Sequence, residues 1–271
     1  MSRPVAYTAK LEISTKFADN QTYPASTYYT PPFKLTNFFR RGNGGIEYML
    51  MNASAGIMAH DNYSIDLELA ENTQLLISAQ SFEKIHSMPS GEARRHTQIK
   101  LAANSCLIFN PLPCIPFANS AFTTTTDIHL ATATSRLIYS EIISSGRYLR
   151  NENFAFRYYT SLLNIYLAKR LVYRDNCQLN PAQQDLTTIG MFEQATHLGN
   201  FIFYGFELAE KDLDRLQLIL NESQLDCAIS QLVGSGYLIR VLATGSEATL
   251  NLFKALINQL EELASARYKI N

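Results

Sequence analysis

Residues 47–86 read EYMLMNASAGIMAHDNYSIDLELAENTQLLISAQSFEKIH, and this stretch sets the pattern for much of the chain. After a turn of small residues at 53–56, residues 63–70 alternate apolar and polar side chains, which is the period of a half-buried strand. Asp61 stands just before that strand. A second apolar run ends in a polar cluster formed by Ser78, Gln80, Ser81, Glu83 and Lys84. The stretch predicts two consecutive strands joined by a short polar turn.

The same strand, turn and strand pattern recurs twice further along the chain. The three copies cover residues 69–77, 101–109 and 130–139, and each begins with a leucine. A spacing of about 30 residues is typical of stacked repeat architectures, in which each copy packs on the next. Stacking would produce layered, β-helix-like sheets. An ordinary meander of neighbouring strands is the alternative.

The remaining segments extend this mainly β pattern. Residues 10–17 alternate as a strand, and the two prolines in 28–35 predict an extended edge segment. Residues 154–175 are ambiguous, because several of their apolar side chains could lie on one helical face, but their aromatic and β-branched content favours two further strands. Helical spacing of leucines predicts a short helix over 208–221, followed by a hairpin over 227–243. An apolar stripe then predicts an amphipathic helix that runs to about residue 266; its members are Leu250, Phe253, Leu256, Ile257, Leu260 and Leu263.

We therefore expect a mainly β fold of stacked sheets with a few helices, including the amphipathic helix at the C-terminal end. We expect one domain over residues 1–271. Its β-rich core would cover about 8–206. The helix, the hairpin and the C-terminal helix would follow at about 207–267.

Composition restricts the classes of partner. The formal net charge is −1, so the chain has no basic field for nucleic acid or an anionic membrane. Charged residues make up 17% of the chain, below the usual level of about 25%. A surface so poor in charge predicts that another protein covers part of it. No N-terminal signal peptide or membrane span is evident, and we expect a cytoplasmic protein.

The reactive residue types form no recognisable centre. The cysteines at 106, 114, 177 and 227 have no paired spacing and are interpreted as reduced thiols. The five histidines are scattered, which argues against a stable metal site. The sequence also lacks the nucleophile elbow, the phosphate-binding loop, the dinucleotide fingerprint and the zinc-protease helix motif. We predict no catalytic residues, no tightly bound cofactor and no enzyme activity.

Two carboxylates are candidates for a weak and transient cation site. Asp61 precedes a strand, and Glu141 interrupts the apolar strand 137–143, where an unpartnered carboxylate would be costly. Glu141 would either line a water-filled passage or pair with Arg147 or Lys84. Arg147 and Glu152 would more simply form an ion pair that joins two strands.

Four ordered motifs resemble the UreD family of urease accessory proteins, which is called UreH in Helicobacter. The first runs from Gly56 to Asp61, where the family has Gly-Gly-x-x-x-Gly-Asp. The second matches Thr/Ser-x-Gln-x-x-x-Lys-x-Tyr/His, and the third matches Pro-x-x-x-Ile-Pro-Phe. The last is similar to Gly-Arg-x-x-x-Gly-Glu-x-Phe. The matching positions in the second to fourth motifs are Ser78, Gln80, Lys84, His86, Pro111, Ile115, Pro116, Phe117, Gly146, Arg147, Glu152 and Phe154.

The resemblance covers about residues 11–175, with several departures. Ala59 and His60 replace a glycine pair, Asn62 replaces an acidic residue, and Asn151 replaces a glycine. Asparagine tolerates positive φ, so the turn at 151 survives the change. These departures leave the fold assignment intact and put the carry-over of individual metal-passage residues in question.

The resemblance implies a non-enzymatic chaperone of urease maturation. Family members bind UreF, recruit the GTPase UreG and dock on apo-urease, and the complex passes nickel to the urease active site. It implies a dimer of heteromeric complexes held through UreF, with Ni²⁺ bound only transiently. The alternative is a β-rich scaffold that holds partners together without a metal path. A hydrolase with a carboxylate pair in a cleft is a third interpretation, and it would require turnover by the purified chain alone.

Overall fold

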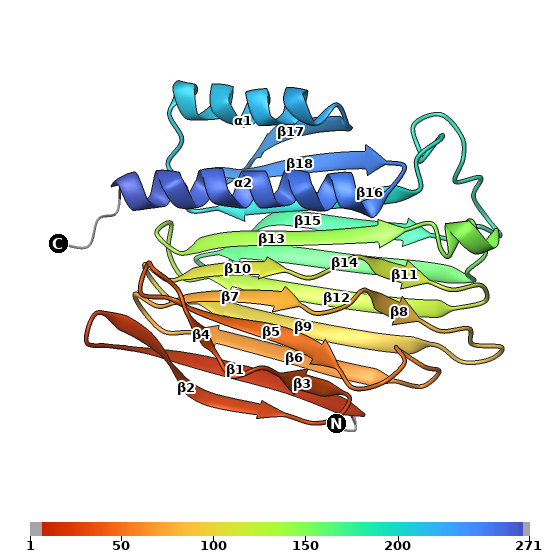
Figure 1. Ribbon diagram of the computed structural model, residues 1–271, viewed down its shortest axis with the longest axis horizontal. Coiled ribbons are helices and arrows are strands. Elements are labelled where there is room, and N and C mark those ends of the chain that lie inside the picture. Colours follow the sequence, from red (N-terminus) through yellow and green to blue (C-terminus); the bar gives the residue numbers. More distant parts are fainter. Residues whose placement is uncertain (1–6, 268–271) are drawn as a thin grey trace.

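The computed structural model describes residues 7–267 as two packed β-sheets with helices on one side (Figure 1). Within these residues, the first sheet has seven strands in the order β15-β14-β12-β9-β6-β1-β2. Their bounds are β1 (Ala9–Ala18), β2 (Gln21–Tyr29), β6 (Asn62–Leu69), β9 (Ala93–Leu101), β12 (Ala121–Leu130), β14 (Tyr158–Leu167) and β15 (Arg170–Leu179).

The second sheet has eleven strands in the same described range, and its main path is β17-β18-β16-β13-β10-β7-β5-β3. These strands are β3 (Phe33–Leu35), β5 (Ile46–Asn52), β7 (Gln74–Ala79), β10 (Cys106–Asn110), β13 (Arg136–Ser144), β16 (His197–Tyr204), β17 (Asp226–Leu232) and β18 (Gly236–Ala243). The short strands off this path are β4 (Phe39–Arg40), β8 (Glu83–Ile85) and β11 (Cys114–Pro116). The helices are α1 (Glu210–Ser223), α2 (Ser246–Arg267) and the 3-10 turn η1 (Tyr148–Arg150).

The three sequence copies stack in register, as the repeat predicts. Leu69, Leu101 and Leu130 are direct partners on the parallel strands β6, β9 and β12. The second strands of the copies, β7, β10 and β13, are also parallel to one another. The stacked, β-helix-like prediction is confirmed. The meander alternative is wrong, because each strand pairs with its counterpart in the next copy.

Polar turns close the sandwich at the end where the copies change sheets. Asn72 and Asn104 occupy equivalent turns with φ of 62° and 58°. Asparagine tolerates this left-handed backbone better than most residues. The hydroxyl of Ser105 donates to the Ala102 carbonyl at 2.8 Å, which satisfies a turn carbonyl that no strand would pair. The turn chemistry therefore explains why each copy keeps a short polar segment.

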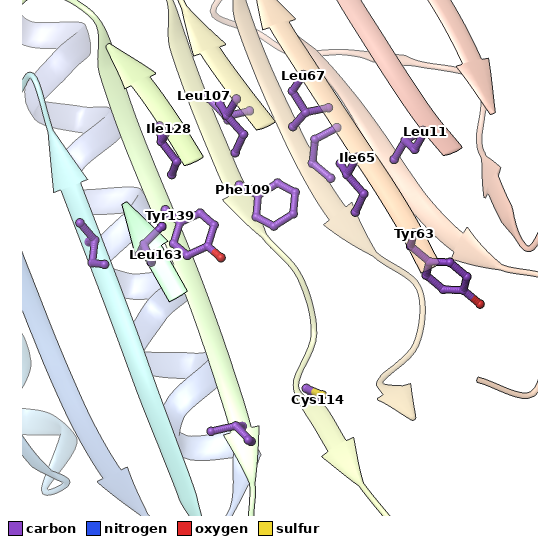
Figure 2. Packing of buried hydrophobic residues seen from close by; sticks show 14 of the residues in the cluster. Leu11, Tyr63, Ile65, Leu67, Leu107, Phe109, Cys114, Ile128, Tyr139 and Leu163 are labelled. Atoms are coloured by element: carbon purple, nitrogen blue, oxygen red, sulfur yellow. The ribbon is translucent and has the colours of Figure 1, made fainter. Parts of the chain in front are cut away.

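Two apolar layers hold the structure together. The first lies between the sheets, where Leu107 and Phe109 of β10 face Ile128 and Leu163 of the other sheet (Figure 2). The second lies between the outer face of the larger sheet and the helices, where Phe253 of α2 packs on Phe201 at a ring-centroid distance of 5.1 Å. The predicted amphipathic helix is thus confirmed as the cover of that face.

The segment with two prolines differs from its prediction. Residues 28–35 were expected to run as one extended edge, but β2 ends at Tyr29 and β3 begins at Phe33. The two strands belong to the edges of different sheets. Pro31 and Pro32 lie in the crossing between them, where neither residue has to donate a ladder hydrogen bond.

Replacing Leu107 with alanine should destabilise the fold strongly. Leu107 is 0% exposed between the two sheets, and a large-to-small change in such a core costs about 2–5 kcal/mol. The measurement is the free energy of unfolding from urea denaturation. Leu149→Ala is the matched control, because that leucine is 96% exposed. Equal stability of the two variants would contradict the assigned core.

Candidate functional site

Long loops gather at the end of the sandwich opposite the tight turns (Figure 1). Ile57, Ile85 and Pro116 pair there as a short parallel ladder that extends the stacking beyond the main strands. All the family-like motifs end in or next to these loops. Stacking therefore brings together motif residues that are far apart in the sequence.

Side chains from successive loops form a column at this end. The ring centroids of His86 and Phe117 are 4.8 Å apart, and the Arg147 guanidinium carbon lies 4.0 Å from the centroid of the Phe117 ring. His86 also bonds the Ala55 carbonyl through Nε2 at 2.9 Å. A cation over an aromatic face is attracted by the ring quadrupole. The column fixes the loops relative to one another.

Arg147 and Glu152 form the predicted ion pair. Arg147 Nε donates to Glu152 Oε2 at 2.8 Å, and this carboxylate also accepts the Ala118 backbone N–H at 3.1 Å. The guanidinium lowers the pKa of the Glu152 carboxyl. Both residues lie in the segment after β13, so the pair closes that loop on itself rather than joining two strands. The hydrogen bond from Ala118 joins this loop to the neighbouring one.

Two motif glycines allow the loops to approach closely. A Cβ at Gly56 would lie 2.4 Å from the Lys84 carbonyl oxygen, and one at Gly146 would lie 2.3 Å from the Glu152 carbonyl oxygen. Both glycines have positive φ, at 147° and 132°. Their place in the motifs therefore has a steric reason.

Asp61 organises the turn before β6. Its Oδ2 accepts the Met58 backbone N–H at 2.7 Å and the Tyr63 hydroxyl at 2.8 Å. Burial of the phenol, together with its hydrogen bond to Asp61, raises the pKa of Tyr63. Asp61 thus has a structural role in this turn, and the structure does not place it with Glu141.

The polar cluster that follows β7 has local partners. Ser78 donates to Glu47 Oε1 at 3.0 Å across β5 and β7, and the Gln80 backbone N–H bonds the Leu50 carbonyl at 2.9 Å. The Lys84 side chain is exposed. These predicted site residues lie away from the interior where Glu141 is found.

Glu141 points into the space between the sheets. It lies on the same face of β13 as Tyr139 and Ile143, which belong to the inter-sheet core. Asn200 of β16 donates through Nδ2 to Glu141 Oε1 at 3.1 Å, and the Ser161 hydroxyl donates to Oε2 at 3.5 Å. Burial raises the pKa of the Glu141 carboxyl, and the Asn200 hydrogen bond opposes that rise. The anticipated pairing of Glu141 with Arg147 or Lys84 is wrong, because neutral donors occupy its two oxygens.

A chain of hydrogen bonds connects Glu141 to the surface. Arg240 of β18 donates through Nε to Asn200 Oδ1 at 3.0 Å, and its other end pairs with Asp175 of β15. Asp175, Asn200 and Arg240 line a cavity of about 440 Å³ between β15 and the β16–β18 region. We call the series Asp175, Arg240, Asn200 and Glu141 the polar relay.

A second ion pair lies on the other side of Glu141. Arg95 of β9 donates through Nη1 to both carboxylate oxygens of Glu83, at 2.6 and 2.7 Å. Burial by itself would lower the pKa of Arg95, but the Glu83 carboxylate outweighs it and the pKa rises. Nearby Cys114 is a free thiol whose pKa burial raises well above its ordinary value. Charged groups are therefore present locally within an otherwise apolar core, and the Arg95 guanidinium is neutralised by the Glu83 carboxylate.

The side chains of the described residues form no preassembled metal site. Among residues 7–267, no group of three or more histidine, cysteine, aspartate or glutamate side chains is arranged to hold a metal ion. Glu141 forms no salt bridge among the described residues, whereas Asp175, the other carboxylate of the relay, is paired with Arg240. No helix in the same range is long and apolar enough to cross a membrane.

Asn200, Arg240, Asp175 and Arg95 are absent from the residues predicted by sequence. Asn200 interrupts the apolar segment 198–204 as Glu141 interrupts 137–143, and that shared pattern was the available clue. Arg240 likewise interrupts the apolar segment 237–243, whereas Arg95 lies in a strand rich in polar residues and gave no such indication.

Comparison with known proteins agrees with the fold and the motifs. The family model described as UreD urease accessory protein matches residues 7–269. The UreD protein of Acetivibrio thermocellus is 35% identical over 93% of this chain and 97% of its own length. The UreH proteins of Helicobacter acinonychis and Helicobacter pylori strain P12 are each 36% identical over 91% of this chain, and over 93% and 92% of their own lengths. The chain therefore belongs to the UreD family of urease accessory proteins.

Proposed function

We propose that this chain is a non-catalytic chaperone that inserts nickel into apo-urease, acting in a complex with UreF and the GTPase UreG. Its relatives are named urease accessory proteins, which supports a role in urease maturation. The complex would be a dimer of heteromeric units joined through UreF and located in the cytoplasm. The polar relay that leads to Glu141 is the observation that carries the nickel proposal.

The relay suits an ion in transit better than a resident ion. A conducting path must bind a cation well enough to admit it and weakly enough to release it. Glu141 offers one carboxylate beside neutral donors, whereas stable metal sites use three or four ligands. Ni²⁺ is thus cargo in this proposal, with no tightly bound cofactor.

Exposed apolar side chains near the loop end suit contact with partner proteins. Leu149 is 96% and Ile189 is 90% exposed, in the segments after β13 and after β15. Large apolar side chains that protrude in this way are common at protein interfaces when they gather in one region. They support the proposal that this chain works inside a complex.

A scaffold without a metal path is the second candidate function. The observation in its favour is that Asp61, Arg147 and Glu152 all hold loops in place. A surface shaped by these contacts could present urease or the other accessory proteins with a fixed docking geometry. The two functions differ in what they require of Glu141.

Glu141→Gln should separate the two functions. Glutamine fills about the same volume and removes the carboxylate charge. A nickel path would therefore lose its anionic ligand at this position while the fold persists. We expect the complex with UreF to form and the nickel content of co-expressed urease to fall several-fold at limiting nickel. Glu68→Gln, on the exposed face of β6, is the matched control. Full nickel loading with Glu141→Gln would favour the scaffold.

Asp61→Ala should act through stability. The change removes two hydrogen bonds to a carboxylate, each of which is worth about 1.5–3 kcal/mol at most. We expect a lower free energy of unfolding and, in proportion, less recovered complex with UreF. Thermal melting of the purified variant measures the first, and co-purification measures the second. A variant of unchanged stability that nevertheless blocks nickel loading would give Asp61 a direct role in passage.

A further inference from the structure

The orientation of the Asn200 amide is fixed by its two neighbours. Arginine can only donate hydrogen bonds, so the contact of 3.0 Å from Arg240 Nε requires Asn200 Oδ1 on that side. The amide nitrogen is then turned toward Glu141 Oε1, at 3.1 Å. The polar relay therefore has a single direction: oxygen toward Arg240 and N–H toward Glu141.

This orientation is the wrong one for a cation. Divalent cations are bound through carbonyl and carboxylate oxygens, and an amide N–H repels them. A cation beside Glu141 would face the Asn200 nitrogen. A half-turn of the amide would present Oδ1 instead, but that turn breaks the bond from Arg240.

Arg240 is placed so that it can move away. Its side chain is 49% exposed and lines the cavity of about 440 Å³, whereas its partner Asp175 is 18% exposed. Asp175 is also held by the Tyr173 hydroxyl at 3.3 Å, so the carboxylate has a second contact that remains if the arginine leaves. The mobile member of the relay is thus the arginine at the cavity.

We propose that Arg240 is a positioning residue that locks Asn200 with its nitrogen toward Glu141, and that withdrawal of Arg240 creates an oxygen pair, Glu141 and Asn200, for a divalent cation. This inference rests on the proposed passage of a cation at Glu141. It adds that in the free chain the Asn200 amide nitrogen prevents a cation from binding beside Glu141. A cation gains entry only when the Arg240 contact is broken.

Tighter cation binding after a change at Arg240 could also result from the loss of its positive charge. The choice of lysine as the replacement removes this competing explanation. Deleting a positive charge near Glu141 would strengthen cation binding by Coulomb attraction without any amide turn. Lysine keeps the charge near Asp175 but carries a methylene where arginine carries Nε. Arg240→Lys therefore releases Asn200 while the local charge stays the same.

The test is Ni²⁺ binding to the purified full chain by equilibrium dialysis. Changing a residue that orients a metal ligand typically alters metal affinity by about 10–100-fold, so Arg240→Lys should bind Ni²⁺ about tenfold more tightly than the unchanged chain. The gain should disappear in Arg240→Lys combined with Glu141→Gln. Arg94→Lys is the matched control, because Arg94 lies on a strand of the other sheet and pairs with Glu92.

Two results would overturn the proposal that Arg240 fixes the orientation of Asn200. One is equal Ni²⁺ affinity in Arg240→Lys and the unchanged chain, and the other is a gain that persists without the Glu141 carboxylate. If Arg240→Lys does not fold, Arg240→Met removes both the Nε donor and the positive charge, so a gain in Ni²⁺ affinity is expected on either ground, and unchanged affinity there would also overturn the proposal. Failure of the passage itself is seen separately, as normal urease loading with Glu141→Gln alone.

Discussion

The parallel hydrogen-bonded register between successive copies is the constraint on which the rest of the structure depends. It places Leu69, Leu101 and Leu130 side by side, and it carries the same alignment into the loops. The column of His86, Phe117 and Arg147 exists because each loop leaves its strand at an equivalent level. The family-like motifs are therefore mainly the parts that let loops stack closely, with glycine where a carbonyl oxygen leaves no room for a Cβ.

The polar interior has no evident advantage for stability. Half-buried ion pairs such as Arg95 with Glu83 lose hydration as they gain attraction, and apolar residues of similar size often serve a fold as well or better. Glu141 adds a carboxyl whose pKa is raised by burial. Arginines that neutralise carboxylates on either side of Glu141 keep such an interior tolerable.

Sequence reasoning predicted the elements better than their contacts. Period-two alternation located β1 and β6, the repeated copies predicted the parallel stacks, and helical spacing located both helices. It failed where the partner lies far along the chain. Arg147 and Lys84 were the partners considered for Glu141 if it did not line a passage, yet its donor Asn200 is 59 residues away and reaches it only through the pairing of β13 with β16. The separation of β2 from β3 into different sheets was also missed. Prolines indicate that a segment lies at the edge of a sheet, but they do not indicate which sheet.

Membership of the UreD family supports a role in urease maturation, and the proposal adds that this chain is needed for urease to receive its metal. The most direct measurement is the nickel content of urease co-expressed with and without the chain at limiting nickel, determined on purified urease. Nickel insertion predicts that metal content collapses when the chain is missing. Equal metal content in the two preparations would contradict it.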